Sequence, residues 1–176
     1  MTKKKNKPKS KSDGPGPPPE QPKRLNKRIT YVYPRWNKAV STAVSPYIGR
    51  VYFHPGVTDR DAIREHETHV MGKFTCSDKS CKMKAWSSKM ISIVIQKYPG
   101  NEYNAIIYNQ RCKKCNNLGC LHLDKECYIE RVAYRLKQWA GLMMEKPYYA
   151  EKKGPPHKSK LCEGCKRGVC RERDGD

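Results

Sequence analysis

The chain has 176 residues, enough for one domain and a tail, and its formal net charge is +20. Hydrophobic residues make up only 36% of it, and a core this thin usually needs disulfides or metal ions for stability. Nine cysteines could supply either. No apolar segment follows the basic N-terminus, and an odd number of cysteines favours reduced thiols, so we expect an intracellular protein of the nucleus or cytoplasm. The apolar runs are too short to predict a transmembrane segment.

Residues 1–28 are expected to form a disordered basic tail. They hold eight lysines and two arginines against Asp13 and Glu20, and the proline-rich stretch at 14–19 disfavours both helix and sheet. The lysine run at 3–11 has the composition of a nuclear localisation patch, and a non-specific basic arm is the alternative. The remaining residues are strongly basic as well, which points to a polyanionic partner.

The rest of the chain is predicted to consist of three parts. Residues 29–71 form an N-terminal extension that packs on the core, with short β-like patterns at 30–36 and 47–54. Residues 72–170 form the zinc-binding domain, and 171–176 are a tail.

A helix is predicted over residues 58–70. Thr58 could cap it, and Asp61 follows three residues later in an arrangement close to a capping box. His66 and His69 would then lie three residues apart on the helix. They are either a paired metal site or two exposed histidines.

Residues 90–110 have the pattern of a β-hairpin. In the first strand, over 90–98, three isoleucines alternate with other residues and therefore share one face. Pro99 and Gly100 follow in the order typical of a type II turn, since glycine tolerates the positive φ that this turn requires. The second strand covers 103–110.

A second helix is predicted from Asp124, as the N-cap, to about Ala140, with Gly141 beyond its C-terminus. Its apolar stripe consists of Ile129, Val132, Ala133, Leu136 and Ala140, with Trp139 at the edge. A basic face carries Arg131 and Arg135. We therefore predict a small α+β zinc-stabilised domain, with a zinc-ribbon-like β-hairpin core and a helix of the C-terminal half packed on it.

Three close pairs of cysteines point to metal binding. Zinc takes four Cys or His ligands in a tetrahedron, and two cysteines separated by two to four residues can hold half of such a site. The hairpin brings Cys81 and Cys112 together, so the first two pairs can share one ion. The third pair is completed by a histidine before it and a cysteine after it. The sequence predicts two Zn²⁺ ions bound by Cys76, Cys81, Cys112, Cys115, His157, Cys162, Cys165 and Cys170.

Some questions about the cluster stay open at this stage. A cross-brace pairing would use the same eight ligands. Cys120 could compete as a ligand, whereas Cys127, at the start of the second helix, is expected to be a buried thiol. Asp78 and Glu163 lie between ligands, where we expect them to tune solubility. Four protein ligands close each site, and no nucleophile–base pattern or phosphate loop is present, so we expect neither an enzyme nor a small-molecule substrate.

Several strings around the cysteines are similar to a known family. GKFTC at 72–76, CKMKAWSS at 81–88, YNQRCKKC at 108–115 and PHKSKLCEGCKRGVC at 156–170 resemble the three-CxxC zinc-binding family. Its members include animal receptor-transporting proteins, zygote arrest proteins and fungal proteins, and YIERVAYRLKQWAG at 128–141 looks most like the fungal branch. The first pair departs from the pattern, with four intervening residues instead of two. The resemblance implies that the eight residues above are the zinc ligands.

Two functions are compatible with these features. The zygote arrest members bind RNA, and aromatic residues lie beside basic ones here, so nucleic acid, with RNA favoured, is the first expected partner. Trp86 and Tyr108 could stack on bases or could instead be core residues. The alternative is a protein-interaction adaptor or trafficking factor for membrane proteins, with the Met-rich run at 142–150 as its surface. The candidate nucleic-acid contacts are Lys82, Lys84, Arg111, Lys113, Lys114, Arg131, Arg135, Lys166 and Arg167.

Overall fold

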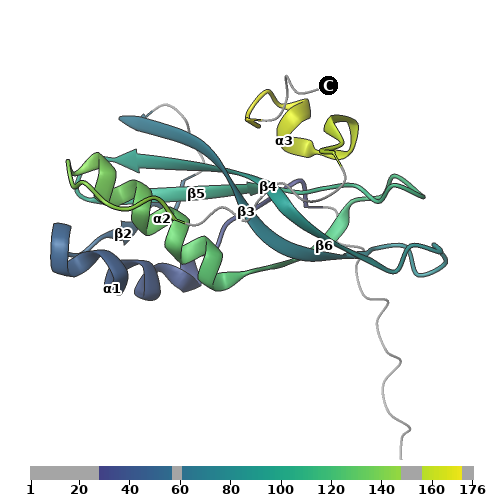
Figure 1. The fold of residues 1–176 in the computed structure, drawn as a ribbon, viewed down its shortest axis with the longest axis horizontal. Helices are drawn as coiled ribbons and strands as arrows, with labels where there is room; N and C mark the ends of the chain where they lie inside the picture. The colour runs from purple at the N-terminus through teal and green to yellow at the C-terminus, as the bar shows by residue number, and fades with distance from the viewer. Residues whose placement is uncertain (1–27, 57–60, 148–155, 172–176) are drawn as a thin grey trace, which may run out of the picture.

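The computed structural model describes residues 28–56, 61–147 and 156–171. Within these ranges the chain forms a curled, mostly antiparallel sheet with strands in the order β1-β5-β4-β3-β6, and β2 runs parallel to β5 (Figure 1). The predicted α+β class is confirmed. The predicted tails lie outside the described residues, apart from Arg28 and Arg171. The shorter strands are β1 (Thr30–Tyr31), β2 (Tyr52–Phe53) and β6 (Gly119–Leu123).

The predicted hairpin is present as β4 (Ala85–Tyr98) and β5 (Glu102–Tyr108). Tyr98 pairs with Glu102, which leaves a three-residue connection between the strands. Gly100 has φ 71°, as the turn prediction requires, and Asn101 also takes a positive φ of 60°. The hairpin begins earlier than predicted because the antiparallel pairing of β4 with β3 extends to Ala85.

The helix predicted over 58–70 is wrong, because residues 64–76 form the long strand β3 (Arg64–Cys76). Thr58, the proposed cap, lies outside the described residues. The strand pairs with β4 along most of its length and with β6 at its C-terminal end. Charged residues at 64–67 favour helix locally, but the isoleucines of β4 offer an apolar pairing surface, and such tertiary contacts override local propensity.

The helix α1 (Asn37–Ile48) was not predicted from the sequence. It buries Val40 and Val44, which lie one turn apart, against the sheet. Pro46 lies in its last turn and cannot donate a backbone hydrogen bond. The carbonyl of Thr42 instead accepts a hydrogen bond from Ser45 Oγ (3.4 Å), and after the proline the amide of Gly49 donates to the carbonyl of Ser45 (3.2 Å). A short 3-10 helix, η1 (Pro34–Trp36), precedes it.

The second predicted helix is confirmed as α2 (Lys125–Trp139). Asp124 caps it by accepting a hydrogen bond from the amide of Cys127 (2.9 Å), and Gly141 follows its end with φ 85°. The apolar stripe is buried at Val132, Ala133 and Leu136, whereas Ile129 is half-buried and Ala140 is exposed. Helices α1 and α2 pack on each other and on one face of the sheet.

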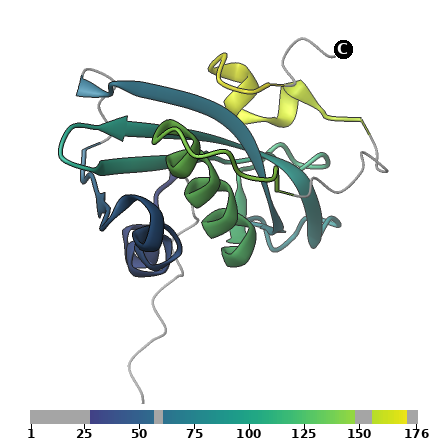
Figure 2. The same cartoon turned by 60° about the vertical axis from the view of Figure 1, so that its left-hand side comes forward.

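The opposite face of the sheet is covered in part by the C-terminal segment, with η3 (Ser159–Leu161) and α3 (Glu163–Lys166). Figure 2 shows this segment across the sheet from α1 and α2. Ser92 Oγ donates to the carbonyl of Val169 (2.7 Å), and Val169 packs against the cluster of Val94, Ile106 and Tyr108. Over residues 91–96, strand β4 is therefore buried on both faces, with Ile91, Ile93 and Ile95 toward the helices.

Candidate metal centres

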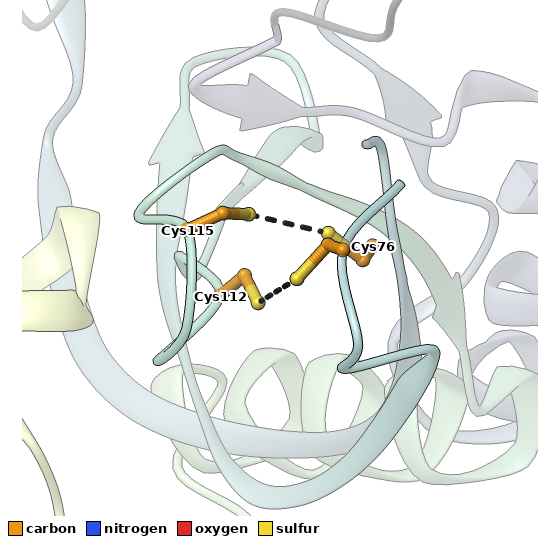
Figure 3. Close-up of side chains that lie close together, drawn as sticks. Cys76, Cys112 and Cys115 are labelled. Atoms are coloured by element: carbon orange, nitrogen blue, oxygen red, sulfur yellow. Dashed lines mark hydrogen bonds between the residues drawn. The ribbon is translucent and has the colours of Figure 1, made fainter. Parts of the chain in front are cut away.

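The first group of ligands lies where β3 ends and where β4 and β6 begin. Cys76 is the last residue of β3, and Cys81 lies in the loop that leads into β4. Cys112 and Cys115 lie in the loop after β5, and Figure 3 shows them facing Cys76 across the space between the two loops. The positive φ of Asn116 (58°) lets this second loop turn back, and its amide donates to the carbonyl of Cys112 (2.8 Å).

The sulfur positions of this group suit a zinc ion. The Sγ atoms of Cys76 and Cys115 are 3.5 Å apart, and those of Cys81 and Cys112 are 3.7 Å apart. A disulfide would place them at about 2 Å. A tetrahedral zinc with four bonds of about 2.3 Å would place them about 3.8 Å apart. All four ligand atoms lie within 4.8 Å of one another, so the residues present fit the ion.

In the absence of a cation, the surroundings of these sulfurs shift their pKa values in different directions. Burial, followed by hydrogen bonds with neighbouring thiols, raises the pKa of Cys76 to about 12. Burial also acts to raise the pKa of Cys112, but the backbone amides of Cys115 and Lys114 donate to its sulfur and lower the pKa to about 7. A divalent cation stabilises all four thiolates at once and displaces the remaining protons.

The second group consists of His157, Cys162, Cys165 and Cys170, whose ligand atoms also lie within 4.8 Å of one another. His157 Nε2 is 3.1 Å from the sulfur of Cys165 and 3.8 Å from that of Cys170. Cys162 precedes α3 as its N-cap, and the helix places Cys165 one turn later. The two groups are therefore sequential along the chain, which decides against the cross-brace pairing. Together they fit two zinc ions, as predicted.

The two histidines near residue 70 do not form a pair. On a strand, residues three apart point to opposite faces of the sheet. His66 faces α2, where it contacts Arg135, and burial followed by the positive charge of Arg135 lowers its pKa to about 4. His69 faces the other way, and its Nε2 lies 3.5 Å from the sulfur of Cys170. The strand therefore excludes the paired-histidine site and places His69 beside the second metal centre.

The two metal centres are linked by direct contacts. Arg111, which precedes Cys112, donates through Nε to the carboxylate of Glu163, which follows Cys162. Glu163 is only 5% exposed and also accepts from Lys166 Nζ (2.9 Å). Burial acts to raise the pKa of Glu163, but hydrogen bonds from Lys166 and Arg111 outweigh it and lower the pKa. The expectation that Glu163 tunes solubility is thus wrong, because its carboxylate is buried in an ion pair.

The two spare cysteines are not part of either group. Cys120 lies on β6, where it pairs with Thr75, and it is half-buried. Cys127 is buried in the first turn of α2, as expected, and burial raises the pKa of its thiol.

The candidate nucleic-acid contacts fall into two classes. Three arginines are engaged by contacts within the protein: Arg131 is buried, with 4% exposure, Arg111 is paired with Glu163, and Arg135 is half-buried against His66. The predicted basic face of α2 is therefore not a continuous surface. Exposed side chains lie on the loops of the two metal centres, at Lys82, Lys84, Lys113, Lys114, Lys166 and Arg167.

The aromatic residues beside these lysines belong to the core. Trp86 is half-buried and stacks on Phe74, with ring centroids 5.1 Å apart and an interplanar angle of 14°. Tyr108 is 9% exposed and packs with Val94 and Ile106. Tyr108 is therefore a core residue, and Trp86 packs at the edge of the core with Phe74 covering one face of its ring.

Two sets of four Cys or His ligands, each able to enclose one ion, lie on an α+β fold, and they define a protein built on structural zinc centres. The family model for the zinc-ribbon three-CxxC zinc-binding domain matches residues 69–168, more than half of the chain, and the chain belongs to this family. No curated protein and no solved structure matches the chain. Among the described residues, no helix is both long enough and apolar enough to cross a membrane.

Proposed function

We propose that this zinc module binds nucleic acid, with single-stranded RNA as the preferred partner, and that it regulates rather than catalyses. The proposal rests mainly on the surface around the first metal centre. The loops at 77–84 and 109–118, which hold three of its four ligands, carry five exposed lysines. We call this surface the lysine tip: Lys79, Lys82, Lys84, Lys113 and Lys114.

The lysine tip has more positive charge than the metal centre needs for neutrality. A zinc ion with four thiolates carries two negative charges. The only acidic residue in the two loops is Asp78, whose carboxylate accepts hydrogen bonds from the amide and the hydroxyl of Ser80 (2.9 and 2.6 Å). The five lysines outweigh these three negative charges, so the tip attracts polyanions.

The chemistry of the tip favours contacts with phosphates. Lysine is a compact charge on a flexible stem, and it suits a backbone of variable shape. Trp86 and Tyr108 are packed in the core, so base stacking contributes little here. RNA is preferred over DNA because the sequence resembles the zygote arrest proteins, which bind RNA.

A role without catalysis is supported by the four protein ligands at each centre, which leave no position for a reacting water.

Fluorescence anisotropy with labelled RNA tests the proposal. The full-length, zinc-loaded chain is titrated against single-stranded RNA and duplex DNA over a salt series. The test variant is Lys113→Gln with Lys114→Gln, two exposed lysines of the tip. We expect weaker RNA binding and a salt slope that is smaller by about 1.4, since each phosphate contact on a single strand contributes about 0.7.

The matched control carries the same loss of charge at the other end of the sheet. Lys38→Gln with Arg50→Gln changes two exposed residues near α1, which Figure 1 shows at the opposite end from the metal-binding loops. If the control weakens binding as much as the tip variant, binding follows net charge and the tip is not the interface. Equal affinity for RNA and DNA that disappears at about 150 mM salt would refute RNA recognition.

A protein-binding role is the second candidate. The side chain of Met143 is 99% exposed, beside an open groove lined by Tyr134, Trp139 and Leu142. Exposed methionine suits binding of varied apolar segments. Residues 148–150 of the predicted Met-rich surface lie outside the described residues. If RNA recognition fails, Met143→Ser is the variant with which to test this surface against a purified membrane-protein segment.

A further inference from the structure

The four ligands of the second metal centre lie within fourteen residues of one another, so this segment could in principle bind its metal alone. It is nevertheless attached to the loop that carries Cys112. The amide of Arg111 donates to the carbonyl of Leu161 (2.8 Å), and the amide of Glu163 donates to that of Asn109 (3.0 Å). Gln110 and Cys162 form an isolated β-bridge. These backbone contacts thus lie beside Cys112, a ligand of the first centre, and Cys162, a ligand of the second.

Side chains add to this backbone connection. The Arg111–Glu163 ion pair joins the residue before Cys112 to the residue after Cys162. The side chain of Glu163 is almost fully buried, with 7% exposure, so the ion pair is well shielded from solvent on that side. Movement of the loop that carries Arg111 would leave Glu163 buried with Lys166 as its remaining partner, which is unfavourable.

A second contact region ties the same segment to the strands. His69 and Ser92 are cross-strand partners on β3 and β4. Ser92 Oγ donates to the carbonyl of Val169, and His69 Nε2 lies 3.5 Å from Cys170 Sγ. A side chain at Gly164 would have its Cβ 2.6 Å from Ser92, so only glycine allows this close approach. The strand β3 that positions His69 ends at Cys76, a ligand of the first centre.

We propose that the two metal centres are energetically coupled, so that the chain holds either both zinc ions or none. The Arg111–Glu163 ion pair is the main coupling contact. The first centre fixes the loop at 109–115, and this loop then presents the arginine and the backbone groups that the second centre needs. Coupling is reciprocal by thermodynamic necessity, so the second centre stabilises the first by the same factor. This inference does not depend on nucleic-acid binding.

Native mass spectrometry of the full-length chain, equilibrated with about one equivalent of zinc per protein under reducing conditions, tests the coupling. It counts chains with no, one and two ions. We call the one-zinc ratio the squared population of one-zinc chains divided by the product of the zinc-free and two-zinc populations. This ratio falls as coupling increases. In the wild type we expect few one-zinc chains. Glu163→Gln should raise the ratio by about 10-fold, the usual effect of losing a hydrogen bond between charged groups.

Two further variants separate coupling from local damage. Lys166→Gln also removes a partner of Glu163, but this lysine lies within the second segment, so the ratio should stay at its wild-type value. Arg111→Gln changes the other side of the contact and should raise the ratio as Glu163→Gln does. The double variant should then equal either single variant, as a double-mutant cycle requires.

Three results would overturn the proposal. The first is a wild type in which one-zinc chains predominate at one equivalent. The second is an unchanged ratio in Glu163→Gln or, if that variant does not fold, in Arg111→Gln. The third is an equal increase in Lys166→Gln, which would show that the effect arises within the second centre. Circular dichroism of each zinc-loaded variant confirms that it is folded before its populations are compared.

Discussion

Cys112→Ser removes one thiolate from the first metal centre and changes the size of the side chain only slightly. The residue is fully buried in the loop after β5, and its sulfur lies 3.7 Å from that of its neighbour in the tetrad, Cys81. Serine is a poor zinc ligand, because its hydroxyl stays protonated at neutral pH. The variant therefore leaves an incomplete tetrahedron and a buried hydroxyl in place of a bound thiolate.

The expected loss is comparable to the whole stability of the domain. Structural zinc contributes about 10–16 kcal/mol of apparent binding free energy in zinc-finger peptides. Single domains are stable by about 5–15 kcal/mol. A buried hydroxyl without its partner costs a further 1–3 kcal/mol, roughly. The core between the sheet and the helices is substantial. However, the first centre holds together the ends of the strands on which this core packs. We expect the variant to lose its native fold.

Two measurements check this expectation together. Thermal melting by circular dichroism reports the fold, and a chromogenic chelator added after denaturation reports zinc per chain. The wild type should contain two zinc ions and melt cooperatively, whereas Cys112→Ser should contain fewer and lose the cooperative transition. Cys120→Ser is the control, since this half-buried cysteine lies in neither tetrad. A variant at Cys112 that keeps two ions and a native melt would show that the ligand is misassigned.

Two further predictions concern packing and acid stability. Gly119→Ala places a Cβ 2.8 Å from Phe74 and 2.9 Å from Trp86, so urea unfolding should show a loss of about 1–3 kcal/mol, and unchanged stability would mean that the two rings can move apart. His66 has its pKa lowered to about 4 by burial and by Arg135, whereas in the unfolded chain it takes up a proton near pH 6.5. Wild-type stability therefore decreases between pH 6.5 and 4 because of this residue, and His66→Gln should lose less stability than the wild type between pH 7 and pH 5. Equal losses in the two proteins would remove His66 as the cause.

The ligand sets were predictable because their determinants are local. The spacing of Cys112 and Cys115 is sufficient to hold half of a zinc site wherever the loop lies. The turn at Pro99 and Gly100 defines an antiparallel hairpin, and such a hairpin necessarily brings its two ends together. Helix α2 was equally predictable, because an N-cap residue, apolar residues at helical spacing and a glycine after the last turn all indicate the same helix.

The tertiary structure decided what depends on distant partners. Residues 64–70 carry local helix propensity, and only the apolar surface of β4 selects a strand, which sends His66 and His69 to opposite faces. The burial of Arg131 likewise follows from how α2 lies on the sheet. Helix α1 and strand β6 gave weak sequence signals, since one contains a proline and the other has only five residues.

The sequence by itself thus determined the metal chemistry of this protein, because four ligands in close pairs are a property of spacing and residue type. It did not determine how the two metal centres relate to each other. The contact between Arg111 and Glu163 joins residues 52 positions apart, and no local pattern marks them as partners. Ion pairs of this kind form only when the sheet has folded and brought the two loops together, and so the tertiary structure alone decided them.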